Sequence, residues 1–101
     1  MTRIISIGSE MFVTAFKIQG IDGFIAKGDD FNNILDLVLA DNTISIVFLQ
    51  DDLYFANQER MDKIKSSMSR PLFVEIPVEK KEHSVDIIAQ LIKNNIGISL
   101  D

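Results

Sequence analysis

The side chains best suited to chemistry follow two apolar, β-branched stretches of the chain. Ser9 and Glu10 come just after the first such stretch, and Asp51 and Asp52 come just after a later one. If both stretches are parallel strands, their carboxyl ends meet at one edge of a sheet, where open parallel sheets bind ligands. Three carboxylates there would suit Mg²⁺, which prefers carboxylate and water oxygens. Because the same residue types commonly cap helices, we expect Ser9 and Asp51 or Asp52 to be helix caps instead.

The turn after the first stretch is poorly suited to phosphate. A phosphate-binding loop between a strand and a helix needs several glycines, as in G-x-G-x-x-G, whereas this turn has only Gly8. The Glu10 carboxylate would also repel a phosphate at the helix N-terminus. We therefore expect no nucleotide or other cofactor at this turn.

Nucleophiles and metal ligands of other kinds are scarce. The chain has no cysteine and a single histidine, His83, which lies in a charged segment. Thiolate chemistry, cysteine-based zinc sites and iron–sulfur clusters are excluded, and a catalytic or zinc-binding histidine would lack partners. No enzyme active site is therefore visible in the sequence, and we expect no catalytic residue, no cofactor and no metal.

Composition narrows the choice of partners. Ten Lys and Arg residues against fifteen Asp and Glu residues give a net charge of −5. A nucleic-acid binder needs a basic face, so nucleic acid is not an expected partner. No apolar run approaches the roughly 20 residues that span a bilayer, so no direct membrane insertion is expected.

Short apolar runs alternate with helical periods, a pattern typical of β-α units around a parallel sheet. We predict one domain over residues 1–101: a small, Rossmann-like, doubly wound α/β fold with a four-stranded parallel sheet in the order 2-1-3-4. Glu75 within the last strand favours an edge position, because a charge inside a two-sided core is costly. The predicted strands are 3–7, 21–26, 44–49 and 72–76, and the predicted helices are 10–19, 31–39, one stretch from Asp51 to Met68, and 85–95.

Local signals support these boundaries. Gly20 is placed to end the first helix in the left-handed conformation, and Asp29 or Asp30 is predicted to cap the second helix. In the first helix, Phe12 and Phe16 are expected to face the sheet. The remaining apolar flank consists of Met11, Ala15 and Ile18. It could pack on a neighbouring helix or on a partner, and we favour packing within the chain.

The last predicted helix has more apolar residues than one stripe against a sheet requires. Ile87 and Leu91 point sideways or outward from the stripe that would face the sheet, and Ile98 and Leu100 add apolar bulk after it. We predict that these four residues form a partner-binding patch, although broader core contact is the alternative for Ile87 and Leu91.

Three segments, together with the final predicted helix and its close at Ile96-Gly97, resemble one family along nearly the whole chain. The segment 7–21 resembles the opening of the F subunit of the V-type and archaeal A-type rotary ATPases. The apolar run 44–49 with Gln50 at its end, and the segment 71–77 with its Pro-hydrophobic-Glu-Ile-Pro pattern, resemble later strands of that family. The residues that match its opening pattern in register are Gly8, Glu10, Val13, Thr14, Phe16 and Gly20.

The resemblance implies a non-catalytic component of the central stalk, or rotor, of a V-type ATPase or A-type ATP synthase. Such a component binds the D subunit, which is the coiled-coil shaft, within the ring of A and B subunits that carry the nucleotide chemistry. It helps to couple ATP hydrolysis or synthesis to transport of H⁺ or Na⁺. The implied location is cytoplasmic, in the peripheral part of a membrane-bound complex.

Two other classes share the alternation of strands and helices. A phospho-receiver signalling domain would use Asp51 or Asp52 as the phosphate acceptor, but it also needs paired acids after the first strand and a fifth strand with a lysine. A small flavodoxin-like enzyme would need a cofactor loop, which the turn at Gly8 does not provide.

Overall fold

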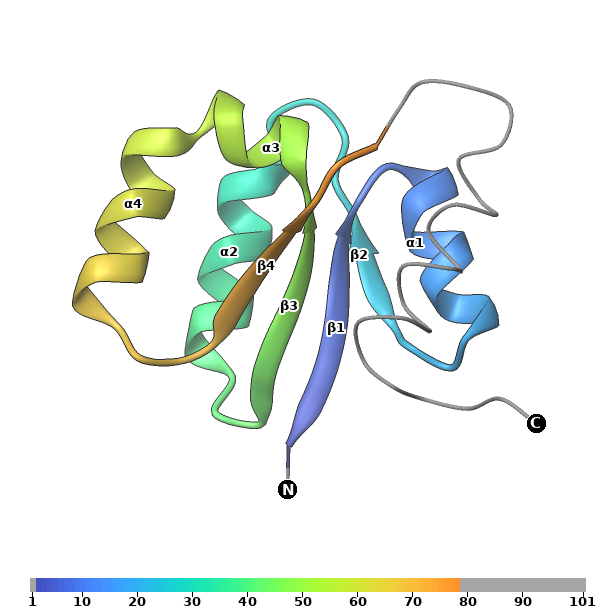
Figure 1. Ribbon diagram of the computed structural model, residues 1–101, viewed down its shortest axis with the longest axis horizontal. Helices are drawn as coiled ribbons and strands as arrows, with labels where there is room; N and C mark the ends of the chain where they lie inside the picture. The colour runs from blue at the N-terminus through green and yellow to red at the C-terminus, as the bar shows by residue number, and fades with distance from the viewer. Residues whose placement is uncertain (1, 79–101) are drawn as a thin grey trace.

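The computed structural model describes residues 2–78 of the chain, which form a parallel sheet flanked by helices (Figure 1). The strands lie in the order β2-β1-β3-β4, so the predicted order 2-1-3-4 is confirmed. All three neighbouring pairs are parallel. The elements are β1 (Arg3–Gly8), α1 (Glu10–Ile18), β2 (Gly23–Ile25), α2 (Asp30–Ala40), β3 (Ile44–Gln50), α3 (Asp51–Ala56), α4 (Gln58–Ser67) and β4 (Leu72–Ile76).

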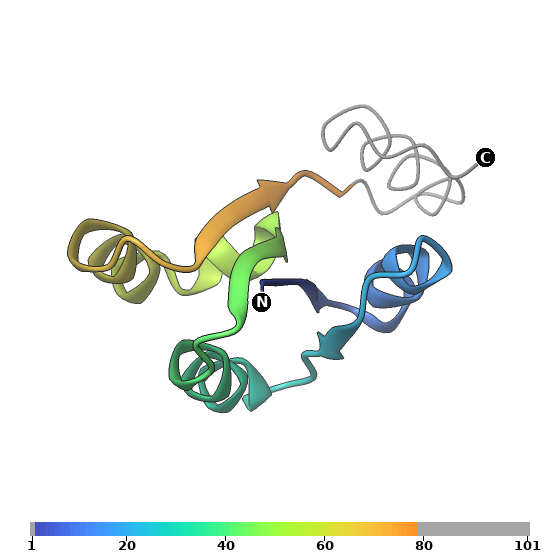
Figure 2. The ribbon, with the colours of Figure 1, turned by 90° about the horizontal axis from the view of Figure 1, so that it is seen from below.

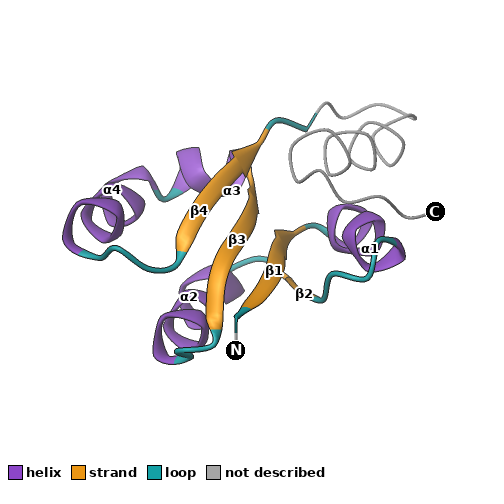
Figure 3. Ribbon diagram, turned by 60° about the horizontal axis from the view of Figure 1, so that its bottom comes forward, coloured by secondary structure: helices purple, strands orange, loops and turns teal. Residues whose placement is uncertain are grey.

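The two faces of the sheet carry different helices. α1 lies against one face, and α2 and α4 lie against the other (Figures 2 and 3). Alternate residues of a strand point to opposite faces, so Val47 and Leu49 of β3 join the α2 side while Phe48 joins the α1 side. The sheet is therefore apolar on both faces, as a doubly wound fold requires.

The α1 side has a small aromatic core. Phe12 and Phe16 face the sheet as predicted, with ring centroids 4.9 Å apart, and Phe16 stacks on Phe48 at 5.1 Å. Gly20 follows the helix with φ of 85°, the left-handed conformation predicted for it. On the flank, Ala15 is buried as expected, but packing of Ile18 within the chain is wrong because its side chain is 68% exposed. Met11 is half-exposed.

Two predictions, one about a helix boundary and one about a helix cap, are corrected. The stretch from Asp51 to Met68 is two helices rather than one, because Asn57 takes φ of −128° and interrupts the helical backbone between α3 and α4. Asp29 stands at the N-cap position of α2, yet its side chain makes no capping hydrogen bond. The last predicted helix, 85–95, lies outside the described residues.

β4 is an edge strand, as the charge within it predicted. Lys65 of α4 donates to both carboxylate oxygens of Glu75 at 2.7 Å. Because the Glu75 carboxylate is paired in this way, it avoids the penalty of an isolated charge in a half-buried site.

Candidate functional site

The carboxyl ends of β1 and β3 lie side by side, because these strands pair in parallel with Ile7 opposite Leu49. The residues that follow, Ser9 and Glu10 on one strand and Asp51 and Asp52 on the other, therefore start two helices at the same edge of the sheet (Figure 1). The predicted placement of these side chains at one edge is confirmed. What they do there differs between the two strands.

Gln50, the last residue of β3, occupies the space between the two strand ends. It is 9% exposed, and its Oε1 accepts a hydrogen bond from the backbone N–H of Ser9 at 2.9 Å. Its Nε2 donates to Oδ2 of Asp52 at 3.1 Å. The backbone N–H at the start of α1 is thus already used by the protein itself, where a phosphate-binding turn would offer it to a ligand.

The turn after β1 is closed tightly around this amide. Gly8 has no room for a side chain, since a Cβ there would lie 2.5 Å from the Phe12 ring and 2.8 Å from Oε1 of Gln50. Ser9 is the N-cap of α1, and its hydroxyl accepts from the N–H of Phe12 at 3.3 Å. The predicted capping role of Ser9 is therefore confirmed.

Capping by Asp51 or Asp52 is wrong. The N-cap position of α3 belongs to Gln50, without a side-chain capping bond, and both aspartates lie within the first turn of the helix. Carboxylates in a first turn still interact favourably with the positive end of the helix dipole. Among residues 2–78, no group of three His, Cys, Asp or Glu side chains is arranged to hold a metal ion.

The inner side of α3 is tied to α4 through one tyrosine. The Tyr54 hydroxyl donates to Oδ1 of Asp62, and Nζ of Lys65 lies 4.7 Å from the centre of the Tyr54 ring. The hydrogen bond to the Asp62 carboxylate, aided by desolvation and the nearby negative charges, raises the pKa of Tyr54 to about 12. Tyr54 and Leu53 also pack, partly buried, against the core between the sheet and α2.

The outer side of α3 carries an exposed aromatic ring. Phe55 is 65% exposed, and its ring meets that of Tyr54 edge-on with centroids 5.7 Å apart. No residue of α3 is fully buried. Sequence reasoning did not single out Phe55, although an aromatic residue directly after the apolar pair Leu53 and Tyr54 was a usable signal.

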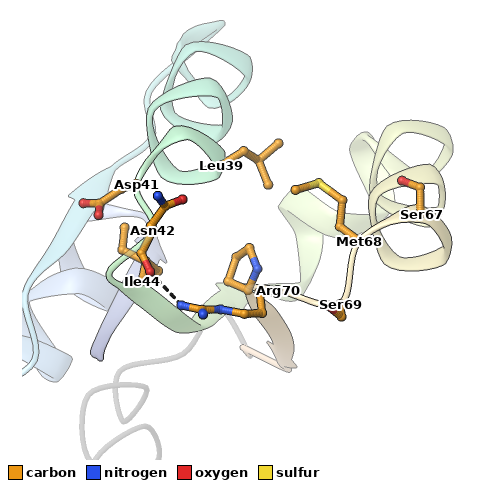
Figure 4. Close-up of a pocket in the computed structure, with 9 residues that line it drawn as sticks. Leu39, Asp41, Asn42, Ile44, Ser67, Met68, Ser69 and Arg70 are labelled. Carbon is orange, nitrogen blue, oxygen red and sulfur yellow. Dashed lines mark hydrogen bonds between the residues drawn. The ribbon is translucent and has the colours of Figure 1, made fainter. Parts of the chain in front are cut away.

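At the opposite edge, the amino ends of β3 and β4 border an open hollow of about 430 Å³ (Figure 4). Its two charged side chains have partners: Arg70 donates to the Asn42 carbonyl at 2.6 Å, and Asp41 pairs with Arg3 at 3.1 Å. Hydrogen bonds from the Thr43 hydroxyl and N–H lower the pKa of Asp41 below its usual 3.8. These two charged groups are therefore already engaged within the chain, where a small-molecule site would use such groups to orient its ligand.

The predicted partner-binding residues Ile87, Leu91, Ile98 and Leu100, and also His83, lie outside the described residues. Sequence reasoning missed the part that Gln50 plays, because its Ser9 partner is 41 positions away. The only available signal was a polar amide at the end of an apolar strand.

None of the helices within residues 2–78 has the length and apolar character needed to cross a membrane.

These features define a class: a small Rossmann-like α/β domain with an all-parallel sheet, whose ligand-binding edge is filled at the β1 end by its own glutamine. The chain belongs to the family of ATP synthase F/14-kDa subunits, whose model matches it over residues 4–98. It is thus an F subunit of the V/A-type ATPases, an accessory part of a rotary complex. Neither curated proteins nor solved structures gave a significant match.

Proposed function

We propose that this chain is a non-catalytic rotor component of a V/A-type ATPase that binds the D subunit, the coiled-coil shaft of the complex. In this role it helps to couple ATP hydrolysis or synthesis on the A and B subunits to H⁺ or Na⁺ transport. It would reside in the cytoplasm, in the peripheral part of the membrane-bound complex. The observation that carries the proposal is the family match over residues 4–98, which covers the strands and helices of the described fold except for Arg3, the first residue of β1.

The carboxyl edge of the sheet supports a binding role rather than a catalytic one. In this fold, ligands bind at the carboxyl ends of the strands, and here the Gln50 amide fills that space and uses the N–H of Ser9. A small parallel-sheet domain whose carboxyl edge is occupied by its own hydrogen bonds is suited to binding other proteins through its outer surfaces.

The contact with the shaft is proposed to include Ile87, Leu91, Ile98 and Leu100. An apolar helical stripe laid against a coiled coil is a common mode of recognition between helices. These residues lie outside the described residues, so their support is the pattern of the sequence alone.

Co-expression with the coiled-coil shaft protein of the same complex tests the proposal. We expect a one-to-one complex that stays intact through size-exclusion chromatography, with its mass measured by light scattering. In the paired variant Ile87→Asp with Leu91→Asp, we expect a folded monomer that no longer joins the complex. A wild-type chain that never associates with the shaft protein would show that the proposed function is wrong.

The phospho-receiver alternative has a direct chemical test. Asp51 and Asp52 lie within α3, and the residue at the end of β3 is Gln50, whose amide cannot accept a phosphoryl group as a carboxylate does. After incubation with acetyl phosphate and Mg²⁺, we expect no gain of a phosphoryl group at either aspartate by mass spectrometry. A stable gain there would favour signalling over the rotor.

A further inference from the structure

The short helix α3 exposes a combination of residues that the packing of the domain does not explain. Asp51 and Asp52 precede Phe55 by four and three positions, so the three residues lie on one side of the helix. We call these three residues the α3 outer face. The start of a helix explains an acidic side chain there, but it does not explain an aromatic ring that is 65% exposed.

The exposed Phe55 ring has one aromatic neighbour that restricts it. Tyr54 contacts it edge-on, and Tyr54 is itself fixed by its hydrogen bond to Asp62 and by the Lys65 ammonium group. A ring that is already oriented loses little conformational freedom when a partner covers it. Aromatic residues of this kind are frequent among the few residues that dominate binding between proteins.

No basic side chain in the described part of the chain forms an ion pair with this face. Within residues 2–78, the bases Arg3, Arg60, Lys63 and Lys65 pair with other acids, and neither Asp51 nor Asp52 belongs to an ion pair. The side-chain hydrogen bond that Asp52 receives comes from the neutral amide of Gln50. An exposed aromatic ring on the same helix side as two carboxylates that form no ion pair with the described residues complements a surface that is apolar and basic at once.

We propose that the α3 outer face is a second contact with the stalk, which takes a helix of the coiled-coil shaft bearing lysine or arginine beside apolar residues. The Phe55 ring packs between the apolar residues of that helix, and Asp51 and Asp52 pair with its basic side chains. This inference rests on the proposed function, and it adds a contact that is independent of Ile87, Leu91, Ile98 and Leu100.

Isothermal titration calorimetry with the intact chain and the coiled-coil shaft protein tests this contact. We expect Phe55→Ala to weaken binding by about tenfold or more, since a central aromatic contact is lost. The paired variant Asp51→Asn with Asp52→Asn should weaken binding several-fold, and its affinity should fall less steeply as salt rises.

Matched controls come from elsewhere on the surface. Leu37 lies in the second half of α2 and is 62% exposed. Asp22 is an exposed acid just before β2, the outer strand on the opposite side of the sheet from β4. We expect Leu37→Ala and Asp22→Asn to bind with unchanged affinity and unchanged salt dependence.

The outcomes separate this inference from the proposed function. If the wild type binds and Phe55→Ala binds equally well, the α3 contact is wrong while the rotor assignment stands. If the wild type does not bind, the proposed function fails and this inference falls with it. The inference is also overturned if Phe55→Ala lowers the thermal midpoint of the free chain far more than Leu37→Ala, because the ring is then covered by the chain itself. The same holds if Phe55→Ala dissolves a dimer, because a second copy is then the occupant.

Discussion

The two strand-to-helix junctions at the carboxyl edge lie side by side, yet they are built in opposite ways. After β1, Ser9 caps α1, Gln50 holds the Ser9 N–H, and Phe12 is 1% exposed. After β3, α3 begins without a side-chain cap, has no fully buried residue, and carries Phe55 at 65% exposure. The β1–α1 junction is directed inward to the core, and the β3–α3 junction is directed outward.

The difference shows how one sheet edge can serve two purposes. The glutamine of β3 closes the space at β1 in which related folds bind small ligands, and this closure stabilises the start of α1. The helix that follows the same glutamine exposes an aromatic ring, and of its two carboxylates Asp52 accepts a hydrogen bond from that glutamine. Substitutions that affect only one junction should therefore separate folding from binding.

The largest expected contrast is between two phenylalanines, one from each junction. Phe12→Ala removes a ring buried between α1 and the sheet and should lower the free energy of unfolding by about 3–5 kcal/mol. Phe55→Ala removes an exposed ring and should lower it by about 1 kcal/mol or less. Urea unfolding followed by circular dichroism measures both, and equal losses would abolish the distinction between the junctions.

Gly8→Ala should give the next largest effect. The added methyl group meets the Phe12 ring at 2.5 Å and the Gln50 amide oxygen at 2.8 Å, so the packing of these two side chains must shift. Overpacking of this kind costs about 1–3 kcal/mol, which the same urea unfolding measures. An alanine variant as stable as the wild type would show that the β1–α1 junction is loose rather than closed.

Gln50→Ala tests the hydrogen bonds that join the two strand ends. Loss of the bonds to Ser9 and Asp52 should lower stability by about 1–2 kcal/mol and speed hydrogen exchange of the Ser9 N–H. Asp51→Ala removes a first-turn carboxylate whose contribution is its interaction with the helix dipole, and it should cost about 0.5 kcal/mol. If Asp51→Ala lowers stability more than Gln50→Ala, the hydrogen bonds of Gln50 do not have the stabilising role given to them here.

The smallest effect concerns the anchoring of α3 at high pH. Tyr54 is the chain's single tyrosine and there is no tryptophan, so its ionisation is visible directly in the ultraviolet spectrum. Its pKa should be about 12 rather than 10.0, and Asp62→Asn should return it toward 10.0. Because the folded-state pKa is the higher one, the protonated phenol stabilises the fold below the unfolded pKa of 10.0, and this contribution is lost as pH rises toward about 12. A wild-type midpoint near 10.0 would contradict the hydrogen bond.

Much of this architecture could be predicted from the sequence because its signals are local. The apolar runs, the cap at Ser9, the left-handed Gly20 and the charge at Glu75 each act over a few residues. The break at Asn57 was missed, since no proline or glycine marks it. The placement of the Gln50 amide was also missed, because a flexible side chain that bonds 41 positions away leaves no periodic pattern.

The most direct test of the account is hydrogen–deuterium exchange of the chain alone and in complex with the coiled-coil shaft protein. The account predicts slower exchange in residues 51–57 on binding, with residues 9–13 unchanged because α1 is already closed by Gln50. Protection confined to residues 9–13, with 51–57 exchanging as in the free chain, would contradict it.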